Sequence, residues 1–310
     1  MGHQQLRRIC RLSLPLLLLS TSHSAQAQAV APQMPVTPAA SGEEDIVVRG
    51  MNRKERDKAI AGYVDALTEM NPADPIALYE PGIYCPAAFG LSDTRNEEVV
   101  ARMWRAAEIA GVRPAARPCI ASAFVFFVDD IAAFLDLLKA QQPIFFGDLL
   151  DKEPRADGGP VLAWQLKRDF DPQHMPLAAR RFGPRVVASP VGGSRILSMI
   201  TRAVAASVVI IERKALLRQS ATQIADYAMM RTVVDGDLRT TVANSQSILR
   251  VLDAPASSRP PTSLTRWDLA YLKGRYKGDL RVYGLRRAAA IRSALKRELD
   301  QSEPADQSAP

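Results

Sequence analysis

The chain has 310 residues, of which 24% are charged and only 6% aromatic, and its formal net charge is +7 at pH 7. This length suits one large domain or two small ones, with a core that folds without metal or disulfide staples. The scarcity of aromatic side chains argues against stacking on single-stranded nucleic acid, so we expect no nucleic-acid partner.

The first 27 residues have the three parts of a secretory signal peptide. Three arginines precede the apolar run LSLPLLLLS, and the small residues of Ala25-Gln26-Ala27 follow it. The apolar run is too short for a membrane-spanning helix, which needs about 20 residues. We therefore expect cleavage of residues 1–27, no transmembrane helix in the mature chain, and a periplasmic location.

Loss of this leader changes the chemistry that the mature chain offers. The formal charge falls from +7 to +4, because the leader carries three arginines and no acids. The remaining cysteines are Cys85 and Cys119, and the remaining histidine is His174. In an oxidising compartment the cysteine pair predicts a disulfide, with a reduced pair or a metal site as the alternative. A single histidine excludes mechanisms that need two histidines on one metal.

After the leader, composition divides the chain into three segments. Residues 28–50 are rich in Ala, Pro, Gln and Ser and predict a disordered linker, which ends in the β-prone stretch DIVVR. That stretch is either an edge strand of this protein or a strand that pairs with a partner's sheet. The globular domain is expected at 51–299, and the polar residues 300–310 predict a disordered tail.

The N-terminal part of the domain, 51–141, predicts helices and a strand. RKERDKAIAGYVDALTEM and TRNEEVVARMWRAAEIAG have helical apolar spacing, and the continuous apolar run in CIASAFVFFVDD predicts a central strand. Asp130 follows this strand and is expected to be the N-cap of the next helix. The alternative is a ligand-binding carboxylate at the carboxyl edge of an open α/β sheet.

Residues 142–195 are rich in Pro, Gly and Arg and predict an irregular arm with one strand, PVLAWQLKRDF. At its end we expect SRILSMITRAV to be a helix capped by Ser194, with an anion site on PVGGSRI as the alternative. Within the arm, His174 follows Asp171 by three residues, which makes it a candidate oriented base. No nucleophile is identified for it, and the other interpretation is an ordinary surface histidine.

The C-terminal part, 196–299, contains the buried-strand pattern ASVVIIERK. Ser220 and Gln223 then predict a capping box, and the helix that follows repeats apolar residues on one face, which explains it as core. Thr265 and Asp268 predict a second capping box. The apolar repeat consists of Ala221, Ile224, Ala225, Ala228 and Met229.

The order of these segments resembles the C-terminal half of zincin-type metalloproteases. In those proteins a helix carries H-E-x-x-H, a Ser-Ile-Met turn follows, and the last helix opens with Leu-x-x-x-Asp. The counterparts here are ADYAM, the turn Ser247-Ile248-Leu249, and LTRWD, all within Ala206 to Tyr276. The frame is more similar still to secreted proteobacterial proteins that keep it without the metal ligands.

The resemblance implies a scaffold without a metal site. Ala225 and Met229 stand where the two histidines would be, and only Asp226 keeps an acid at the position of the catalytic glutamate. Zinc takes nitrogen, oxygen or thiolate ligands, which alanine does not supply and for which a thioether is a poor substitute. We therefore expect no cofactor, and an Asp226 that is paired with backbone or arginine.

Nine basic residues lie between Lys273 and Glu298, against two acids. Part of this charge falls on a helix and is either a solvated face or a surface for anionic lipid or an acidic envelope protein. The candidate contacts are Arg286, Arg287, Lys296 and Arg297.

Together these observations predict a mixed α/β, or α+β, domain with a central sheet and flanking helices. The function expected is that of an exported, non-catalytic binding or assembly module of the bacterial envelope. The alternative is a hydrolase that uses carboxylates, either without metal or with a metal bound through oxygen ligands. Its candidate residues are Asp226, His174 and Asp130.

Overall fold

The computed structural model describes residues 52–69, 74–147, 150, 154–178, 194–235, 246–252 and 260–301. The predicted signal peptide, the linker with its DIVVR stretch, and the tail beyond residue 301 lie outside these residues. Within the described ranges no helix is both long enough and apolar enough to cross a lipid bilayer.

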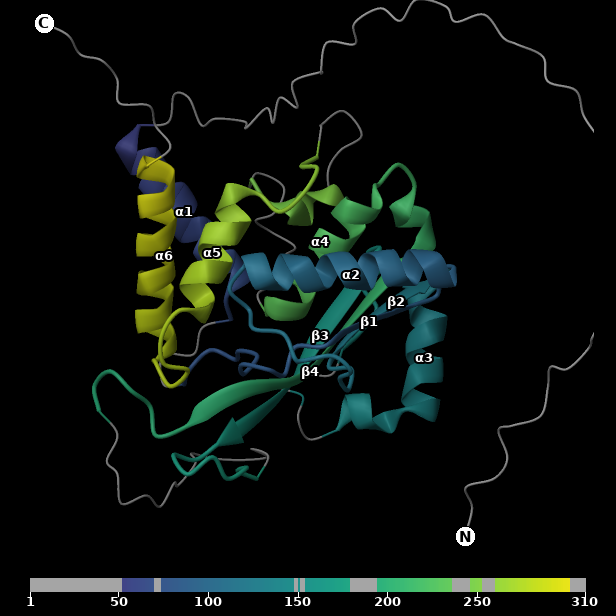
Figure 1. Cartoon of the computed structure of the whole chain (residues 1–310), viewed down its shortest axis with the longest axis horizontal. Coiled ribbons are helices and arrows are strands. Elements are labelled where there is room, and N and C mark those ends of the chain that lie inside the picture. Colours follow the sequence, from purple (N-terminus) through teal and green to yellow (C-terminus); the bar gives the residue numbers. More distant parts are fainter. Residues whose placement is uncertain are drawn as a thin grey trace, which may run out of the picture. The chain divides into compact units, whose positions relative to one another are not determined.

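A four-stranded mixed sheet, in the order β1-β2-β4-β3, lies at the centre of the domain (Figure 1). β1, β2 and β4 run parallel, and β3 pairs antiparallel with β4. The predicted mixed α/β fold with a central sheet is therefore confirmed. The strands are β1 (Pro86–Phe89), β2 (Ala123–Val128), β3 (Val161–Phe170) and β4 (Thr201–Glu212).

Both faces of the sheet are covered, because successive side chains of a strand point to opposite sides. In β4, Val209 and Ile211 join the larger core, whereas Val208 and Ile210 join a smaller one on the other face. Two-sided burial is usual for parallel strands and explains the continuous apolar runs of β2 and β4.

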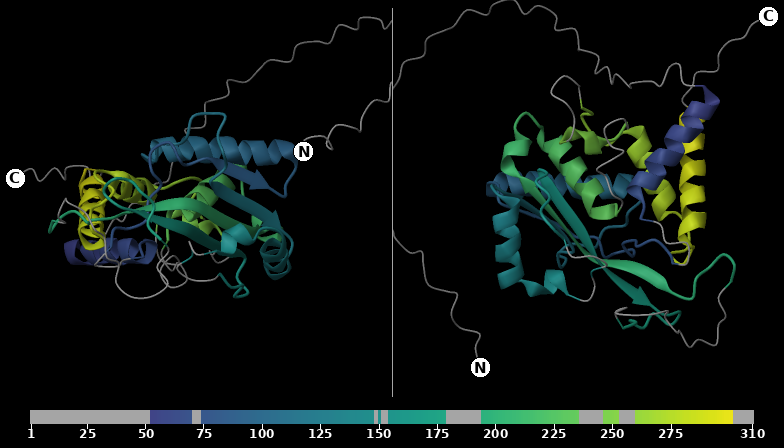
Figure 2. Two further views of the ribbon diagram at one scale, coloured as in Figure 1. Left: turned by 90° about the horizontal axis from the view of Figure 1, so that it is seen from below. Right: turned by 180° about the vertical axis from the view of Figure 1, so that it is seen from behind.

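Six α-helices are described, and five of them pack on the larger core (Figure 2). These five are α1 (Arg53–Leu67), α2 (Asp93–Ile109), α4 (Ala221–Val233), α5 (Arg266–Tyr276) and α6 (Gly284–Asp300). The smaller core lies under α3 (Ile131–Gln141) and the 3-10 helix η1 (Pro143–Phe146).

The helices begin where the sequence predicts. Ser220 and Thr265 each form a capping box, with Gln223 and Asp268 respectively. Asp130 caps α3, because its carboxylate accepts a hydrogen bond from the backbone N–H of Ala133 at 2.8 Å. These side chains satisfy donors that a helix start otherwise leaves free.

The helix predicted in SRILSMITRAV is wrong. Residues 194–200 are irregular and β4 begins at Thr201, so the last four residues of that stretch are strand. β4 pairs with β3 over ten positions of β3, and this pairing outweighs the local helical spacing. The Ser194 hydroxyl accepts hydrogen bonds from the N–H groups of Ile196 and Leu197, as in a turn.

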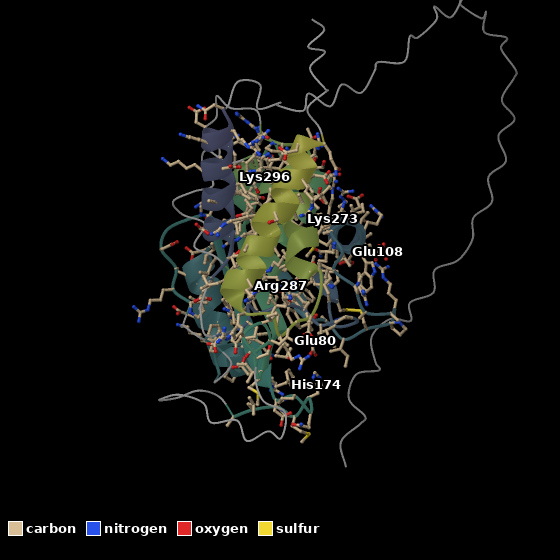
Figure 3. The ribbon with its side chains drawn as sticks, turned by 90° about the vertical axis from the view of Figure 1, so that its left-hand side faces the viewer. Glu80, Glu108, His174, Lys273, Arg287 and Lys296 are labelled. Carbon is tan, nitrogen blue, oxygen red and sulfur yellow. A yellow bond between two sulfur atoms is a disulfide. The ribbon has the colours of Figure 1, made fainter. Side chains whose placement is uncertain are left out.

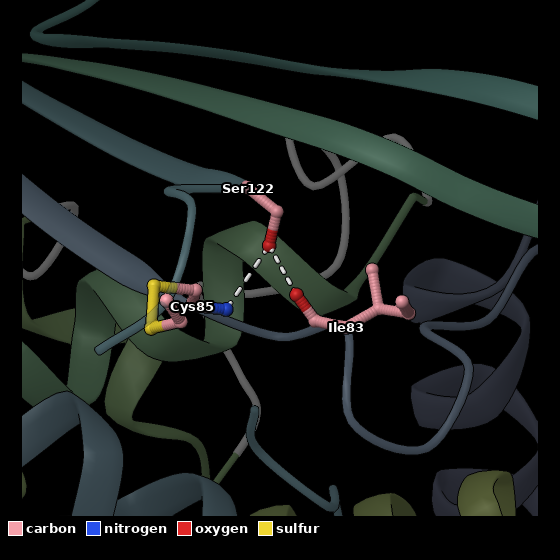
Figure 4. The surroundings of a disulfide bond; sticks show 4 residues. Ile83, Cys85 and Ser122 are labelled. Carbon is pink, nitrogen blue, oxygen red and sulfur yellow. Dashed lines mark hydrogen bonds between the residues drawn. A yellow bond between two sulfur atoms is a disulfide. The ribbon is translucent and has the colours of Figure 1, made fainter. Parts of the chain in front are cut away.

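The predicted disulfide is present between Cys85 and Cys119, whose Cα atoms are 6.2 Å apart (Figure 4). It ties the connection between α2 and β2 to the start of β1. Beside it, the Ser122 hydroxyl donates to the carbonyl of Ile83 at 2.7 Å and accepts from the N–H of Cys85 at 3.0 Å. The connection is thus fixed at the sheet by covalent and hydrogen bonds together.

Candidate functional site

The helix that aligns with the zincin metal helix, α4, is buried around most of its circumference. Ten of its 13 residues are buried, so the prediction of a single apolar face understates its burial. Ala225 and Met229, at the positions of the two histidines, are both 0% exposed and belong to the larger core. The position is filled by core packing.

Asp226 is the only acid in the segment of α4 that aligns with the zincin motif, and its carboxylate forms an ion pair. Its two oxygens each accept a hydrogen bond at 2.7 Å from the guanidinium of Arg102 on α2. One of them also accepts from the backbone N–H of Leu264 at 2.9 Å. The Asp226 side chain is fully buried, and that of Arg102 is 24% exposed.

The Arg102–Asp226 pair has the geometry of a structural link. The hydrogen bond to Asp226 raises the pKa of Arg102, which keeps the guanidinium charged. Two parallel N–H···O bonds hold the carboxylate in a fixed orientation. Both oxygens of Asp226 therefore face donors from the protein itself.

A second buried carboxylate, Asp268 at the start of α5, joins the other segments of the motif. One oxygen accepts from the hydroxyls of Tyr63 at 2.7 Å and Ser247 at 2.6 Å. The other accepts from the backbone N–H groups of Ile248 and Thr265, both at 2.9 Å, and from the Thr265 hydroxyl. The Ser-Ile-Leu turn is therefore anchored directly to the aspartate of α5.

Burial raises the pKa of Asp268, and the hydrogen bonds from Ser247, Ile248, Thr265 and Tyr63 partly oppose this shift. Asp268 is 0% exposed. Its role in the structure is to fix the turn and α1 to the last helix pair.

The chain has no match among family models, curated proteins or solved structures. The order strand, helix, Ser-Ile-Leu turn, helix is present as the sequence predicts. The resemblance to zincin-type proteins stays a prediction.

Metal-binding side chains do not gather anywhere in the described ranges, where no three His, Cys, Asp or Glu residues stand in a cluster suited to an ion. The other candidate residues of the sequence lie apart from Asp226, on different elements.

His174 lies in the turn after β3 and is exposed (Figure 3). Its ring stacks on Phe170 at 4.4 Å, and its Nε2 atom is 3.6 Å from the carboxylate of Glu80. Asp171 does not orient the ring, because its carboxylate accepts hydrogen bonds from the turn's own backbone two and four residues on. The carboxylate beside this histidine is thus Glu80 and not the predicted Asp171.

The carboxyl edge of the parallel strands is occupied by Arg213. Its guanidinium pairs with both oxygens of Asp129 and donates to the carbonyls of Gly90 and Phe127. The hydrogen bond to Arg213 lowers the pKa of Asp129, so that carboxylate stays ionised. Asp130 is used as the cap of α3, as described above. The charged side chains at this edge are thus engaged with one another and with the backbone.

The four basic candidates of α6 have different environments, and one of them was placed wrongly. Arg287 is 2% exposed and donates to the carbonyls of Lys277 and Asp279, so it is a buried brace for the loop between α5 and α6. Burial lowers the pKa of Arg287. Lys296 pairs with Asp57 of α1 at 2.9 Å, and the other two candidates, Arg286 and Arg297, are exposed.

Arg275 of α5, one of the nine basic residues between Lys273 and Glu298, is also buried. It is 0% exposed and donates to the Tyr271 hydroxyl at 3.0 Å, to the carbonyl of Ala77 at 2.9 Å and to Asp235 at 3.1 Å. The i, i+4 spacing of Tyr271 and Arg275 is the only sequence signal for this contact.

One apolar surface is left partly open. Phe89 of the edge strand β1 is 47% exposed and stacks on Phe126 at 5.4 Å. Phe124 and Phe145 continue the contacts toward η1, where Ile144 is 75% exposed. We call these four phenylalanines, with Ile144, the aromatic face. The sequence alone does not reveal this face, because the burial of a strand's second face depends on how far α3 and η1 reach.

Proposed function

We propose that this chain is an exported, non-catalytic binding or assembly module of the bacterial envelope. Its C-terminal half would be a metalloprotease-like scaffold in which the metal site has become core. The observation that carries the proposal is the buried Arg102–Asp226 ion pair at the position of the catalytic acid.

The rival function, a carboxylate hydrolase, needs an acid and a base that reach one substrate atom. The three candidate residues are instead engaged separately. Asp226 is held by Arg102, Asp130 caps α3, and His174 stacks on Phe170. These contacts favour the binding module.

The aromatic face supports a protein partner in particular. Interface centres are enriched in aromatic side chains, and an exposed apolar cluster on a folded domain commonly marks a docking surface. Phe89 and Ile144 are the most exposed large side chains of this face.

Photo-crosslinking in cells tests this proposal. A crosslinking amino acid placed at Phe89 or Ile144 is expected to capture a defined protein, whereas the same group at Ala289, an exposed residue of α6, is not. Substitution Phe126→Ala, beneath Phe89, should weaken the capture. If no position captures a protein, and the purified chain shows a hydrolytic activity that Asp226→Asn abolishes, the proposal is wrong and the hydrolase stands.

A further inference from the structure

The N-terminal end of α1 lies beside the C-terminal end of α6. Arg56 pairs with Asp300 at 2.9 Å, and Lys296 with Asp57 at the same distance. Further along, Arg292 pairs with Asp65. The two helices are thus antiparallel neighbours at one side of the domain (Figures 1 and 2). We call this pair of helix ends the helix-end surface.

The helix-end surface carries a net positive charge. It contains six cationic and four acidic residues, which leaves a net charge of +2. The acids are occupied. Asp57 and Asp300 are ion-paired, Glu298 lies 3.9 Å from Arg266, and Glu55 accepts the backbone N–H at the helix start. The six cations are Arg53, Lys54, Arg56, Lys58, Lys296 and Arg297.

Four of these cations point their charge at solvent. Arg53, Lys54, Lys58 and Arg297 are exposed, and none forms an ion pair with an acid of the described ranges. Arg297 was a candidate of the sequence analysis. The three others come from α1, whose apolar spacing predicts only a helix that packs on the core.

The position of these charges is unfavourable for the helix itself. Arg53 and Lys54 are the first two residues of α1, where the helix dipole favours anions and disfavours cations. Arg53 offsets part of this cost through its attraction to Asp57 one turn on, but residues that break a local rule tend to serve function. A cationic α1 terminus is therefore better explained by an external partner than by stability.

The surface lacks what a protein interface normally needs. Among the described residues, no large hydrophobic side chain is exposed on α1 or on the C-terminal half of α6. Protein interfaces depend on buried apolar or aromatic anchors, whereas a layer of anionic headgroups attracts cations without them. The chemistry of the surface favours lipid headgroups over a protein.

We propose that the helix-end surface attaches this protein to anionic phospholipid through Arg53, Lys54, Lys58 and Arg297. This inference rests on the proposed envelope function for its location, but it uses a different surface from the aromatic face. Attachment is electrostatic and reversible, since no apolar group of the surface enters the bilayer.

The test is co-sedimentation of the protein with vesicles of equal parts phosphatidylglycerol and phosphatidylcholine, compared with phosphatidylcholine alone. Binding is expected to the mixed vesicles only. It should disappear as the salt concentration rises from about 0.1 M to about 1 M, because the Debye length falls from ~10 Å to ~3 Å.

The decisive variant is Arg53→Glu, Lys54→Glu, Lys58→Glu. It should lower the affinity for mixed vesicles more than about tenfold, given ~1 kcal/mol for each cation near such a surface. Its melting temperature should be unchanged or higher, because anions suit a helix N-terminus. The matched control reverses the same number of exposed cations elsewhere, at Arg105, Arg155 and Arg218, and should bind normally.

Three results would overturn the inference. The protein would bind both vesicle types equally, the control would lose binding as much as the α1 variant, or the protein would bind immobilised polyglutamate and no vesicle. The last result would assign the surface to an acidic protein. Crosslinking through the aromatic face is independent of all three, so a failure here is separable from a failure of the proposed function.

Discussion

At the residue scale, the buried charges of this protein are explained by the partners that surround them. Asp226, Asp268 and Arg275 are each fully buried, and each has at least three hydrogen-bonding contacts. A buried charge is tolerated only when it is paired and hydrogen-bonded, because removal from water costs several kcal/mol. These residues link elements that are distant in the sequence, as Arg102 and Asp226 do across 124 positions.

Substitution Asp226→Asn should destabilise the protein by about 2–4 kcal/mol, because it leaves the largely buried guanidinium of Arg102 without its charged partner. The measurement is the free energy of unfolding in urea. The matched variant, Arg102→Met with Asp226→Leu, replaces the pair by apolar groups and should stay within about 1 kcal/mol of the wild type. Equal stability of the single variant and the wild type would contradict a structural role.

The raised pKa of Asp268 predicts in which direction its contribution to stability changes with pH. The folded state holds the proton more tightly than the unfolded state, so this contribution is present below the unfolded pKa of 3.8 and is lost as pH rises through the folded pKa. The stability of the wild type relative to Asp268→Asn should therefore decrease as the pH is raised from 3.8. An increase would mean that the hydrogen bonds to the carboxylate outweigh its burial.

At the scale of elements, local signals in the sequence predict much of the structure. Ser220, Thr265 and Asp130 cap helices as expected, and the apolar runs become β2 and β4. Capping depends on residues three positions apart, so it is readable from one stretch of chain. The helix expected after Ser194 fails because pairing with β3 is a long-range effect.

Side-chain partners across the fold are less predictable than elements. A basic helical run does not reveal that Arg287 turns inward to brace a loop, or that Arg275 meets Asp235. The sequence predicts that Asp226 pairs with backbone or with an arginine. It does not identify Arg102 as that arginine, because the contact depends on the packing of α2 on α4.

Loss of the Cys85–Cys119 disulfide is expected to lower the free energy of unfolding by about 3–4 kcal/mol, because the bond closes a long loop in the unfolded chain. The cysteines are separated by 34 positions. Denaturant unfolding of Cys85→Ala with Cys119→Ala, beside the reduced wild type, measures the effect. The double variant and the reduced wild type should have the same free energy of unfolding. A double variant as stable as the oxidised wild type would argue against a structural disulfide.

At the scale of the whole molecule, the described domain has two surfaces with different chemistry. The aromatic face lies on β1, β2 and η1, and the helix-end surface lies on α1 and α6. A protein partner on the first and anionic lipid on the second would let one domain join an envelope protein to a membrane.

The proposed function requires that the protein is exported. We expect the mature protein to begin at Gln28 and to appear in the periplasmic fraction, because the leader pattern ends in Ala-Gln-Ala. Mass spectrometry of the N-terminal peptide from fractionated cells checks both points. An intact N-terminus in the cytoplasmic fraction would remove the oxidising environment, and with it the physiological basis for the disulfide.

The measurement that tests the central claim most directly is crosslinking through Phe89 in a protein that carries Arg102→Met and Asp226→Leu. If α4 is structural and the module works by binding, the same protein is captured as in the wild type, and with the same yield. If this variant folds with unchanged stability yet no longer captures its partner or supports the protein's function in cells, Asp226 has a chemical role. The non-catalytic account would then be contradicted.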